Sequence, residues 1–146
     1  MVERIALPMA APAGHVSCTS CAKCCTYVGV GINTPDNVRY ATDVLWYLYH
    51  QNVSVYRDSD GEWSIIFETR CKNLQDDLLC GVYESRPLVC REFEDTTCEV
   101  NAPNGGRAFT EPAQFLDWLK ATKPGLHQRI SHKFVPPKVA AATGRR

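Results

Sequence analysis

Apolar side chains recur at helical spacing between residues 34 and 50. The residues at this spacing are Val38, Ala41, Leu45 and Leu48. Thr34, Pro35 and Asp36 predict the start of the helix, with Thr34 as N-cap and Pro35 in the first helical position. We therefore expect a helix that runs to about His50 and buries one face. The same segment contains three aromatic residues, Trp46, Tyr47 and Tyr49. We expect them to belong to the core and not to form a stacking platform.

The pattern then changes to alternation. Val53 to Arg57 alternates apolar and polar residues, Asp58 to Gly61 supplies turn residues, and Trp63 to Thr69 is rich in β-branched and aromatic side chains. This order predicts a β-hairpin. The Gly/Val segment 27–33 before the helix fits a strand or a loop.

The second half of the chain contains one further strong helical signal. Thr110 and Pro112 predict a helix start, and the sequence Lys123-Pro-Gly predicts its end. The side chains expected to pack on the domain are Phe115, Leu116 and Leu119. Residues 80–93 predict a turn and a short helix starting near Ser85, and residues 99–110 predict a loop. The fold class is thus α+β: a small single domain with two main helices and a β-hairpin around a cysteine-rich centre.

The domain boundaries follow from length and composition. At 146 residues the chain has the length of one domain that buries a core without covalent cross-links. We expect a flexible Pro/Ala-rich leader over 1–17, a cysteine-cluster domain over 18–134 and a disordered basic tail over 135–146. The leader is too short and interrupted for a signal peptide, and no stretch reaches membrane-spanning length. We therefore predict a cytoplasmic protein without a membrane partner.

Charge is balanced overall but unevenly distributed. Residues 1–119 hold nine Lys and Arg against all 16 acids, whereas residues 120–146 hold seven basic residues and no acid. A solvated tail is the simpler interpretation, and docking of the tail onto a protein partner is the alternative. Nucleic acid is not an expected partner, because few aromatic residues interrupt the basic block.

Eight cysteines are the strongest chemical signal. They are Cys18, Cys21, Cys24, Cys25, Cys71, Cys80, Cys90 and Cys98. Cysteines two residues apart turn their sulfurs toward one point, as thiolates do around zinc or an iron-sulfur cluster. In a reducing cytosol such clusters bind metal more often than they form disulfides. We predict all eight as metal ligands.

The spacing favours one metal over another. Zinc ribbons pair two Cys-x-x-Cys knuckles, but the cysteines from Cys71 onward form no knuckle. Three cysteines in a Cys-x-x-Cys-x-x-Cys run with a remote fourth ligand are typical of bacterial ferredoxins. We therefore prefer an iron-sulfur cluster of the 4Fe-4S type, with zinc as the alternative and disulfides or free thiols third.

The adjacent pair Cys24 and Cys25 does not fit one simple four-cysteine site. Neighbouring side chains diverge, so one cysteine would serve each of two sites, or would bridge two ions, or one would be a buried thiol. Basic residues also stand beside the cysteines, at Lys23, Arg70, Lys72, Arg86 and Arg91. They would neutralise thiolate charge or lower thiol pKa values.

The combined motif resembles a known family. The run Cys18-x-x-Cys21-x-x-Cys24-Cys25, then Cys71 and Cys80-x-x-Tyr83-x-x-Arg86-Pro87-x-x-Cys90-x-x-Phe93, is similar to the bacterial CxxCxxCC or YkgJ-like family of zinc- or iron-chelating domains. The resemblance covers residues 18–98 and implies metal chelation. Some larger relatives are described as flagellin lysine methylases, but no cosubstrate-binding motif is found here.

These observations predict a metal-binding protein. An iron-sulfur cluster with full thiolate ligation would serve electron transfer or sensing, whereas zinc with four thiolates would be structural. The alternatives are a component of a metal-dependent protein-modification enzyme and a zinc-stabilised interaction module. Sequence motifs leave open whether the chain is an enzyme.

Overall fold

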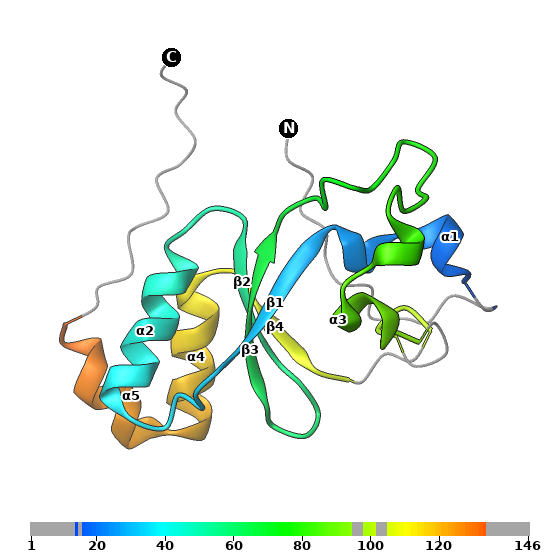
Figure 1. Ribbon diagram of the computed structural model, residues 1–146. Helices are drawn as coiled ribbons and strands as arrows, with labels where there is room; N and C mark the ends of the chain where they lie inside the picture. Colours follow the sequence, from blue (N-terminus) through cyan, green and yellow to red (C-terminus); the bar gives the residue numbers. More distant parts are fainter. Residues whose placement is uncertain (1–13, 15, 95–97, 102–104, 134–146) are drawn as a thin grey trace, which may run out of the picture.

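The computed structural model describes residues 14, 16–94, 98–101 and 105–133 (Figure 1). The elements in chain order are α1 (Cys18–Cys21), η1 (Lys23–Cys25), β1 (Tyr27–Ile32), α2 (Val38–Leu48), β2 (Val53–Arg57), β3 (Trp63–Glu68), η2 (Tyr83–Ser85), α3 (Leu88–Arg91), β4 (Arg107–Phe109), α4 (Pro112–Thr122) and α5 (Pro124–Ser131), where η marks a 3-10 helix. The strands form one antiparallel sheet in the order β1-β3-β2-β4. This confirms the α+β class of a small single domain.

The predicted hairpin lies at the centre of the sheet. Strands β2 and β3 pair with Val55 opposite Ile65, and the turn Asp58–Gly61 joins them. Strand β1 pairs with the outer side of β3, so the Gly/Val segment is a strand rather than a loop. Strand β4 adds to β2 with Phe109 opposite Val55. Its three residues fall in the segment predicted as a loop, where they are too few to show an alternating pattern.

The long helices are present, but their caps differ from the prediction. Helix α2 is capped by Asn37, whose Oδ1 accepts from the Tyr40 N–H at 3.0 Å, and not by Thr34. Glu111, rather than Thr110, caps α4. The side-chain oxygen of Gln114 accepts hydrogen bonds from the backbone N–H groups of Thr110 and Glu111. In both cases a polar residue nearer the helix satisfies the first N–H groups.

A third long helix, α5, follows α4 and was not predicted from the sequence. The sequence Lys123-Pro-Gly does end α4, but Pro124 is also the first residue of α5. Proline suits this position because its missing N–H is not needed in the first turn. Leu126 and Ile130 are four residues apart and buried, so α5 packs its apolar side on the domain. The short helix near Ser85 is also later than predicted, at Leu88–Arg91.

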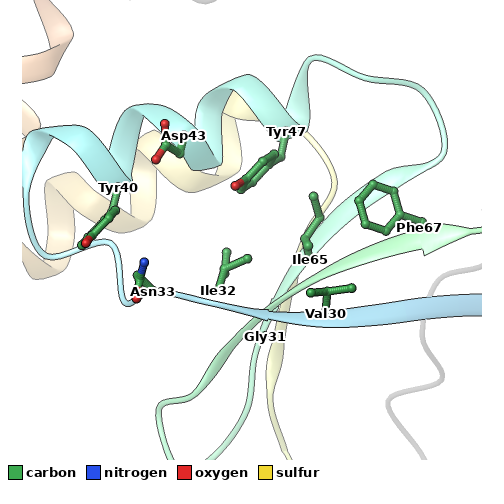
Figure 2. A pocket seen from close by; sticks show the side chains of 9 residues that line it. All are labelled: Val30, Gly31, Ile32, Asn33, Tyr40, Asp43, Tyr47, Ile65 and Phe67. Carbon is green, nitrogen blue, oxygen red and sulfur yellow. The ribbon is translucent and has the colours of Figure 1, made fainter.

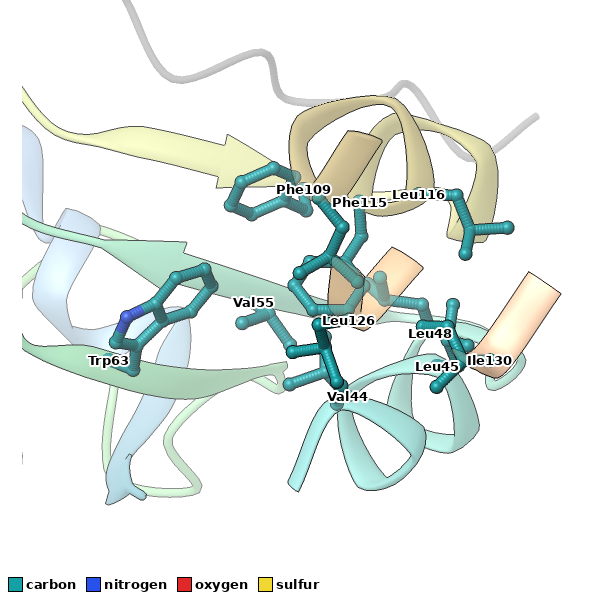
Figure 3. Close-up of a cluster of buried hydrophobic side chains, with 12 residues drawn as sticks. Val44, Leu45, Leu48, Val55, Trp63, Phe109, Phe115, Leu116, Leu126 and Ile130 are labelled. Carbon is teal, nitrogen blue, oxygen red and sulfur yellow. The ribbon is translucent and has the colours of Figure 1, made fainter. Parts of the chain in front are cut away.

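The hydrophobic core lies between one face of the sheet and helices α2, α4 and α5 (Figure 3). Its members are Ala41, Val44, Leu45, Leu48, Val55, Trp63, Phe109, Phe115, Leu116, Leu119, Leu126 and Ile130. The Trp63 and Phe109 rings stack at 5.6 Å, with the Phe115 and Trp118 rings edge-on to them. No cysteine contributes to this cluster.

The aromatic residues of α2 are mostly not core, contrary to the prediction. Trp46 and Tyr49 are 59% and 46% exposed, and Tyr47 is only half-buried. The buried stripe of α2 is supplied by Ala41, Val44, Leu45 and Leu48. Trp46 and Tyr49 therefore face solvent, whereas Tyr47 packs partly buried against the core.

The helices that form the hydrophobic core and the segments that carry the cysteines lie at opposite ends of the molecule. Figure 1 shows the helices α2, α4 and α5 at one end of the sheet and α1, α3 and the cysteine-bearing loops at the other. No helix of the described residues has the length and apolarity to cross a bilayer. The predicted leader and tail fall mainly on residues 1–13 and 134–146, outside the described residues, and stay predictions.

Candidate metal centre

The β1–β3 ladder brings Cys71 to Cys25. Beyond the strand ends, the Thr69 N–H donates to the Thr26 carbonyl at 2.9 Å, and the Cys71 N–H donates to the Cys25 carbonyl at 2.7 Å. These two bonds continue the antiparallel pairing of β1 with β3. The hairpin thus delivers Cys71 to the first cysteine run, as its place in the sequence predicts.

A small closed loop then places Cys80. Leu74 and Cys80 form an isolated antiparallel bridge, and the Gly81 N–H donates to the Asn73 carbonyl at 2.8 Å. The loop reverses at Leu78, whose φ of +67° is left-handed. Leu74 is buried under the loop. Cys80 therefore returns to the vicinity of Cys71 although eight residues separate them.

Arginine side chains organise the segment that carries Cys90. The Arg91 guanidinium donates to the carbonyls of Glu84 at 2.7 Å and Arg86 at 2.9 Å. Arg86 lies over the Tyr83 ring at 3.7 Å and donates to the Tyr83 carbonyl. These contacts hold helix α3 against η2, because the planar guanidinium of Arg91 bridges the carbonyls of Glu84 and Arg86.

Four thiols gather here, and we call them the dispersed group: Cys25, Cys71, Cys80 and Cys90. All three later cysteines act electrostatically on Cys25. Cys25 and Cys80 are half-buried, whereas Cys71 and Cys90 are exposed. The dispersed group therefore opens to solvent on one side.

The other four thiols form what we call the clustered group: Cys18, Cys21, Cys24 and Cys98. All four line one small, mostly apolar cavity together with Val16, Ala22, Lys23, Phe93, Glu99 and Val100. Ser17 caps α1, and Ala22 ends it in the left-handed conformation with φ of +50°. This turn starts η1, which carries Cys24 and Cys25.

Asn101 brings Cys98 to the clustered group. Its side-chain amide accepts from the Val16 N–H at 2.8 Å and donates to the Val16 carbonyl at 2.9 Å. The chain just before Cys18 is thereby tied to the chain just after Cys98, across 85 residues of sequence. No sequence motif marks Asn101, so its role was not predicted.

Cys24 and Cys25 are adjacent in space and in sequence, yet they belong to different groups. Burial, followed by the neighbouring Cys25 thiol, raises the pKa of Cys24 to about 12, although part of its side chain reaches solvent. Burial also raises the pKa of Cys25, and the hydrogen bond from the Cys24 thiol opposes that rise. Both thiols are therefore protonated at neutral pH without metal, so metal binding releases protons.

A carboxylate and a phenol stand beside the clustered group. Glu99 lies 3.9 Å from the Lys23 Nζ, and the Tyr27 hydroxyl is hydrogen-bonded to the Glu99 carboxylate. Burial, and then the charge of Glu99, raise the pKa of Tyr27 above its usual range. Sequence analysis did not select Glu99 or Tyr27, although Glu99 is the acid that follows Cys98 directly.

The basic residues serve the loops more than the thiols. Arg70 donates to the carbonyls of Leu74 and Gln75, and Arg86 and Arg91 donate to the carbonyls of residues 83–86. Lys23 pairs with Glu99. The arginines thus have a structural role, which is to hold the loops bearing the dispersed group, and the neutralising role of the basic residues stays a prediction.

The donors suit a thiophilic metal, but the sulfurs do not yet close around one. All eight cysteines are described, as thiols rather than disulfides. Among the described residues, no three His, Cys, Asp or Glu side chains already surround a point that could hold an ion. Binding therefore requires the thiols of each group to turn inward, which exposed side chains on short loops permit. Four cysteines per group match the ligand number of zinc and of 4Fe-4S clusters.

A second cavity lies away from the cysteines (Figure 2). It has a volume of about 420 Å³ and lies between β1 and α2. Its lining residues are Val30, Gly31, Ile32, Asn33, Tyr40, Asp43, Tyr47, Ile65 and Phe67. This lining has no cysteine or histidine, so the cavity is separate from the candidate metal centre.

Comparison with known proteins is consistent with this geometry. Residues 17–118, more than two-thirds of the chain, match the CxxCxxCC family, described as a "putative zinc- or iron-chelating domain". No curated protein and no solved structure matches the chain. The matched range includes all eight cysteines, the Arg-Pro turn and the strands that bring them together. The chain therefore belongs to the CxxCxxCC family of zinc- or iron-chelating domains.

Proposed function

We propose that this domain binds metal at two adjacent sites, each made of four cysteine thiolates. The clustered group would form one site and the dispersed group the other. The observation that carries the proposal is the division of Cys24 and Cys25. Cys24 lines the cavity with Cys18, Cys21 and Cys98, whereas Cys25 interacts with Cys71, Cys80 and Cys90.

We prefer iron-sulfur clusters of the 4Fe-4S type at these sites, with zinc as the alternative. The preference rests on the spacing of Cys18, Cys21 and Cys24 with Cys98 as a remote fourth ligand. An iron-sulfur cluster would supply electron transfer or sensing, and zinc would supply a structural cross-link. This chain's residues would position the thiolates, release their protons on binding and supply N–H donors and cations around the sulfurs.

The proposal also covers the location of the protein and the segments on either side of the domain. A reducing cytosol would keep all eight thiols available, so we propose a cytoplasmic location. We keep the domain at 18–134, with residues 1–17 as a flexible leader and residues 135–146 as a basic tail that a protein partner could bind. Deletion of residues 135–146 without loss of any protein binding would contradict the role of the tail.

The direct test is anaerobic purification followed by metal and sulfide analysis, a visible spectrum and a thiol count. Two 4Fe-4S clusters predict about eight iron and eight sulfide ions per chain with a brown colour, and two zinc sites predict two zinc ions in a colourless protein. Stoichiometric zinc without colour would contradict the iron-sulfur preference. Metal for only one site, with four thiols still reactive, would contradict the division into two sites.

A further inference from the structure

One oxygen of the Glu99 carboxylate has no hydrogen-bond donor. The Oε1 atom is buried and has no hydrogen-bond partner among the described residues. The Lys23 Nζ, at 3.9 Å, lies beyond hydrogen-bonding range of it. A buried carboxylate oxygen without a donor is costly, so such an atom in a native structure calls for a missing partner.

The position of Glu99 indicates what that partner is. Glu99 lines the same small cavity as the four thiols of the clustered group. A carboxylate beside thiolates is repulsive unless a cation lies between them. Lys23 supplies one positive charge, which cannot balance a carboxylate and four thiolates together. A bound divalent ion would give the unpaired oxygen a partner and would reduce the excess negative charge.

The neighbours of Glu99 also fix its orientation. Tyr27, at the start of β1, is hydrogen-bonded to the carboxylate, and the Nζ of Lys23, on η1, lies 3.9 Å from Oε1. Asn101, two residues later, ties the segment to Val16. The carboxylate is therefore held at the cavity by contacts that leave Oε1 near the Lys23 ammonium but without a hydrogen bond.

We propose that Glu99 is an oxygen ligand of a zinc ion in the clustered group, where it takes the place of one of the four thiolates. The inference rests on the proposed binding of metal by that group, and it makes the two sites chemically unequal. Thiolates prefer soft ions, whereas carboxylates bind harder ions and exchange more readily. The clustered site would accordingly be the more exchangeable of the two, with a ligand other than cysteine.

The test uses the full chain loaded with zinc(II) alone and the isosteric variant Glu99→Gln. The amide of this variant keeps a hydrogen-bond acceptor for Tyr27 but lacks the anionic oxygen. We expect one of two zinc equivalents to bind at least about tenfold more weakly in competition with a chromophoric chelator, and the other to be unchanged. X-ray absorption should show a zinc–oxygen shell at about 2.0–2.2 Å in the unmodified chain that disappears in the variant.

Two control variants separate ligation from a structural role. Glu92→Gln alters an exposed carboxylate at the end of α3 and should leave both zinc equivalents unchanged. Lys23→Met removes the ion pair but keeps the carboxylate. If Glu99 is a ligand, the zinc–oxygen shell should persist in Lys23→Met, even where loss of the neighbouring positive charge weakens zinc binding. If Glu99 serves only to pair with Lys23, neither the unmodified chain nor this variant should show that shell.

The outcomes distinguish this inference from the proposed function. Two zinc equivalents with unchanged affinity in Glu99→Gln, or an all-sulfur zinc shell in the unmodified chain, would overturn the ligand role alone. Fewer than two equivalents in the unmodified chain would overturn the two-site proposal, and the ligand role with it if the lost equivalent is that of the clustered group.

Discussion

Cys24 and Cys25 are adjacent in the sequence but belong to two different groups of thiols. In the 3-10 turn Lys23–Cys25 the two side chains remain within hydrogen-bonding reach of each other. Beyond that contact, Cys24 faces the cavity lined by Cys98, and Cys25 faces Cys71 across the extended β1–β3 ladder. Adjacency, which is an obstacle to one four-cysteine site, would allow the two proposed sites to share a turn.

Cys24→Ser and Cys25→Ser should therefore each remove one of the two sites. We expect each single variant to retain about half the metal of the unmodified chain, because the remaining group keeps four thiols. The double variant should retain almost none. Metal analysis of the anaerobically purified chains is the measurement. A single variant that loses all metal would instead indicate one shared polynuclear centre.

Gly106 occupies a position where a methyl group does not fit. A Cβ atom there would overlap the Tyr56 hydroxyl and come within 2.7 Å of the Arg57 carbonyl. Because the carbonyl belongs to the sheet and cannot move away, Gly106→Ala should lower the free energy of unfolding by about 1–3 kcal/mol. Urea denaturation measures this change.

Gly125 is the matched control for that variant. A Cβ atom there meets nothing within 4 Å, and the residue lies in the first turn of α5. Gly125→Ala should leave stability unchanged or raise it by up to about 0.5–1 kcal/mol, because alanine is the better helix former. Equal destabilisation by both variants would contradict the steric argument.

At the scale of elements, hydrogen bonds to backbone carbonyls replace a hydrophobic core around the cysteines. Tyr83, Leu88, Val89 and Phe93 are all 45% or more exposed. The segment instead depends on the arginines that bridge η2 and α3. Such short elements have little stability of their own, so bound metal should contribute much of their order.

Arg91→Lys should loosen helix α3 without removing its charge. Lysine is a point donor and cannot bridge the carbonyls of Glu84 and Arg86 in one plane. We expect metal at the dispersed group to bind about tenfold more weakly, with unfolding of the hydrophobic core unchanged. Chelator competition and urea denaturation are the measurements. Arg129→Lys, at an exposed position of α5, is the control and should affect neither.

Asn101→Ala should detach Cys98 from the clustered group. The variant loses both hydrogen bonds to Val16, at about 0.5–1.5 kcal/mol each. We expect weaker metal binding by the clustered group alone, because Cys98 is its ligand remote in sequence. The measurement is stepwise chelator competition. Loss at the dispersed group instead would show that the assignment of Cys98 is wrong.

At the scale of the whole molecule, one sheet joins two regions with different sources of stability. The helices α2, α4 and α5 pack aromatic and aliphatic side chains against the sheet (Figure 3). The opposite end contains the eight thiols, and most of its side chains are half-buried or exposed. Strands β1 and β3 connect the two regions, and their extended ladder ends at Cys25 and Cys71.

Removal of metal should consequently unfold one end and spare the other. With a chelator present, we expect fast amide exchange in residues 16–25 and 69–94, while α2, α4, β2 and β3 stay protected. The near-UV signal of Trp63 and Trp118 should persist because their neighbours in the core include no cysteine. Hydrogen exchange with mass spectrometry measures this difference. Global loss of protection would show that the core depends on metal.

Much of the fold follows from local pattern alone. The helix with Ala41, Leu45 and Leu48, and the hairpin around Gly61, were predicted because spacing and turn chemistry are properties of neighbouring residues. The strand β4 and the helix α5 were not, because three strand residues and a Lys-Pro-Gly sequence carry little local information. The exposure of Trp46 was missed since pattern does not show which face a neighbouring element covers.

The sequence by itself determined the chemical class of this protein, because the cysteine pattern, with four of the eight thiols in the CxxCxxCC run, is that of a zinc- or iron-chelating domain. Only the tertiary structure decided which thiols meet. A hydrogen bond beyond the β1–β3 ladder brings Cys71 to Cys25, and the Asn101 amide ties the segment after Cys98 to Val16, next to the start of α1. It also placed Glu99 beside the clustered group. These juxtapositions depend on hydrogen bonds between residues far apart along the chain, which no local pattern records.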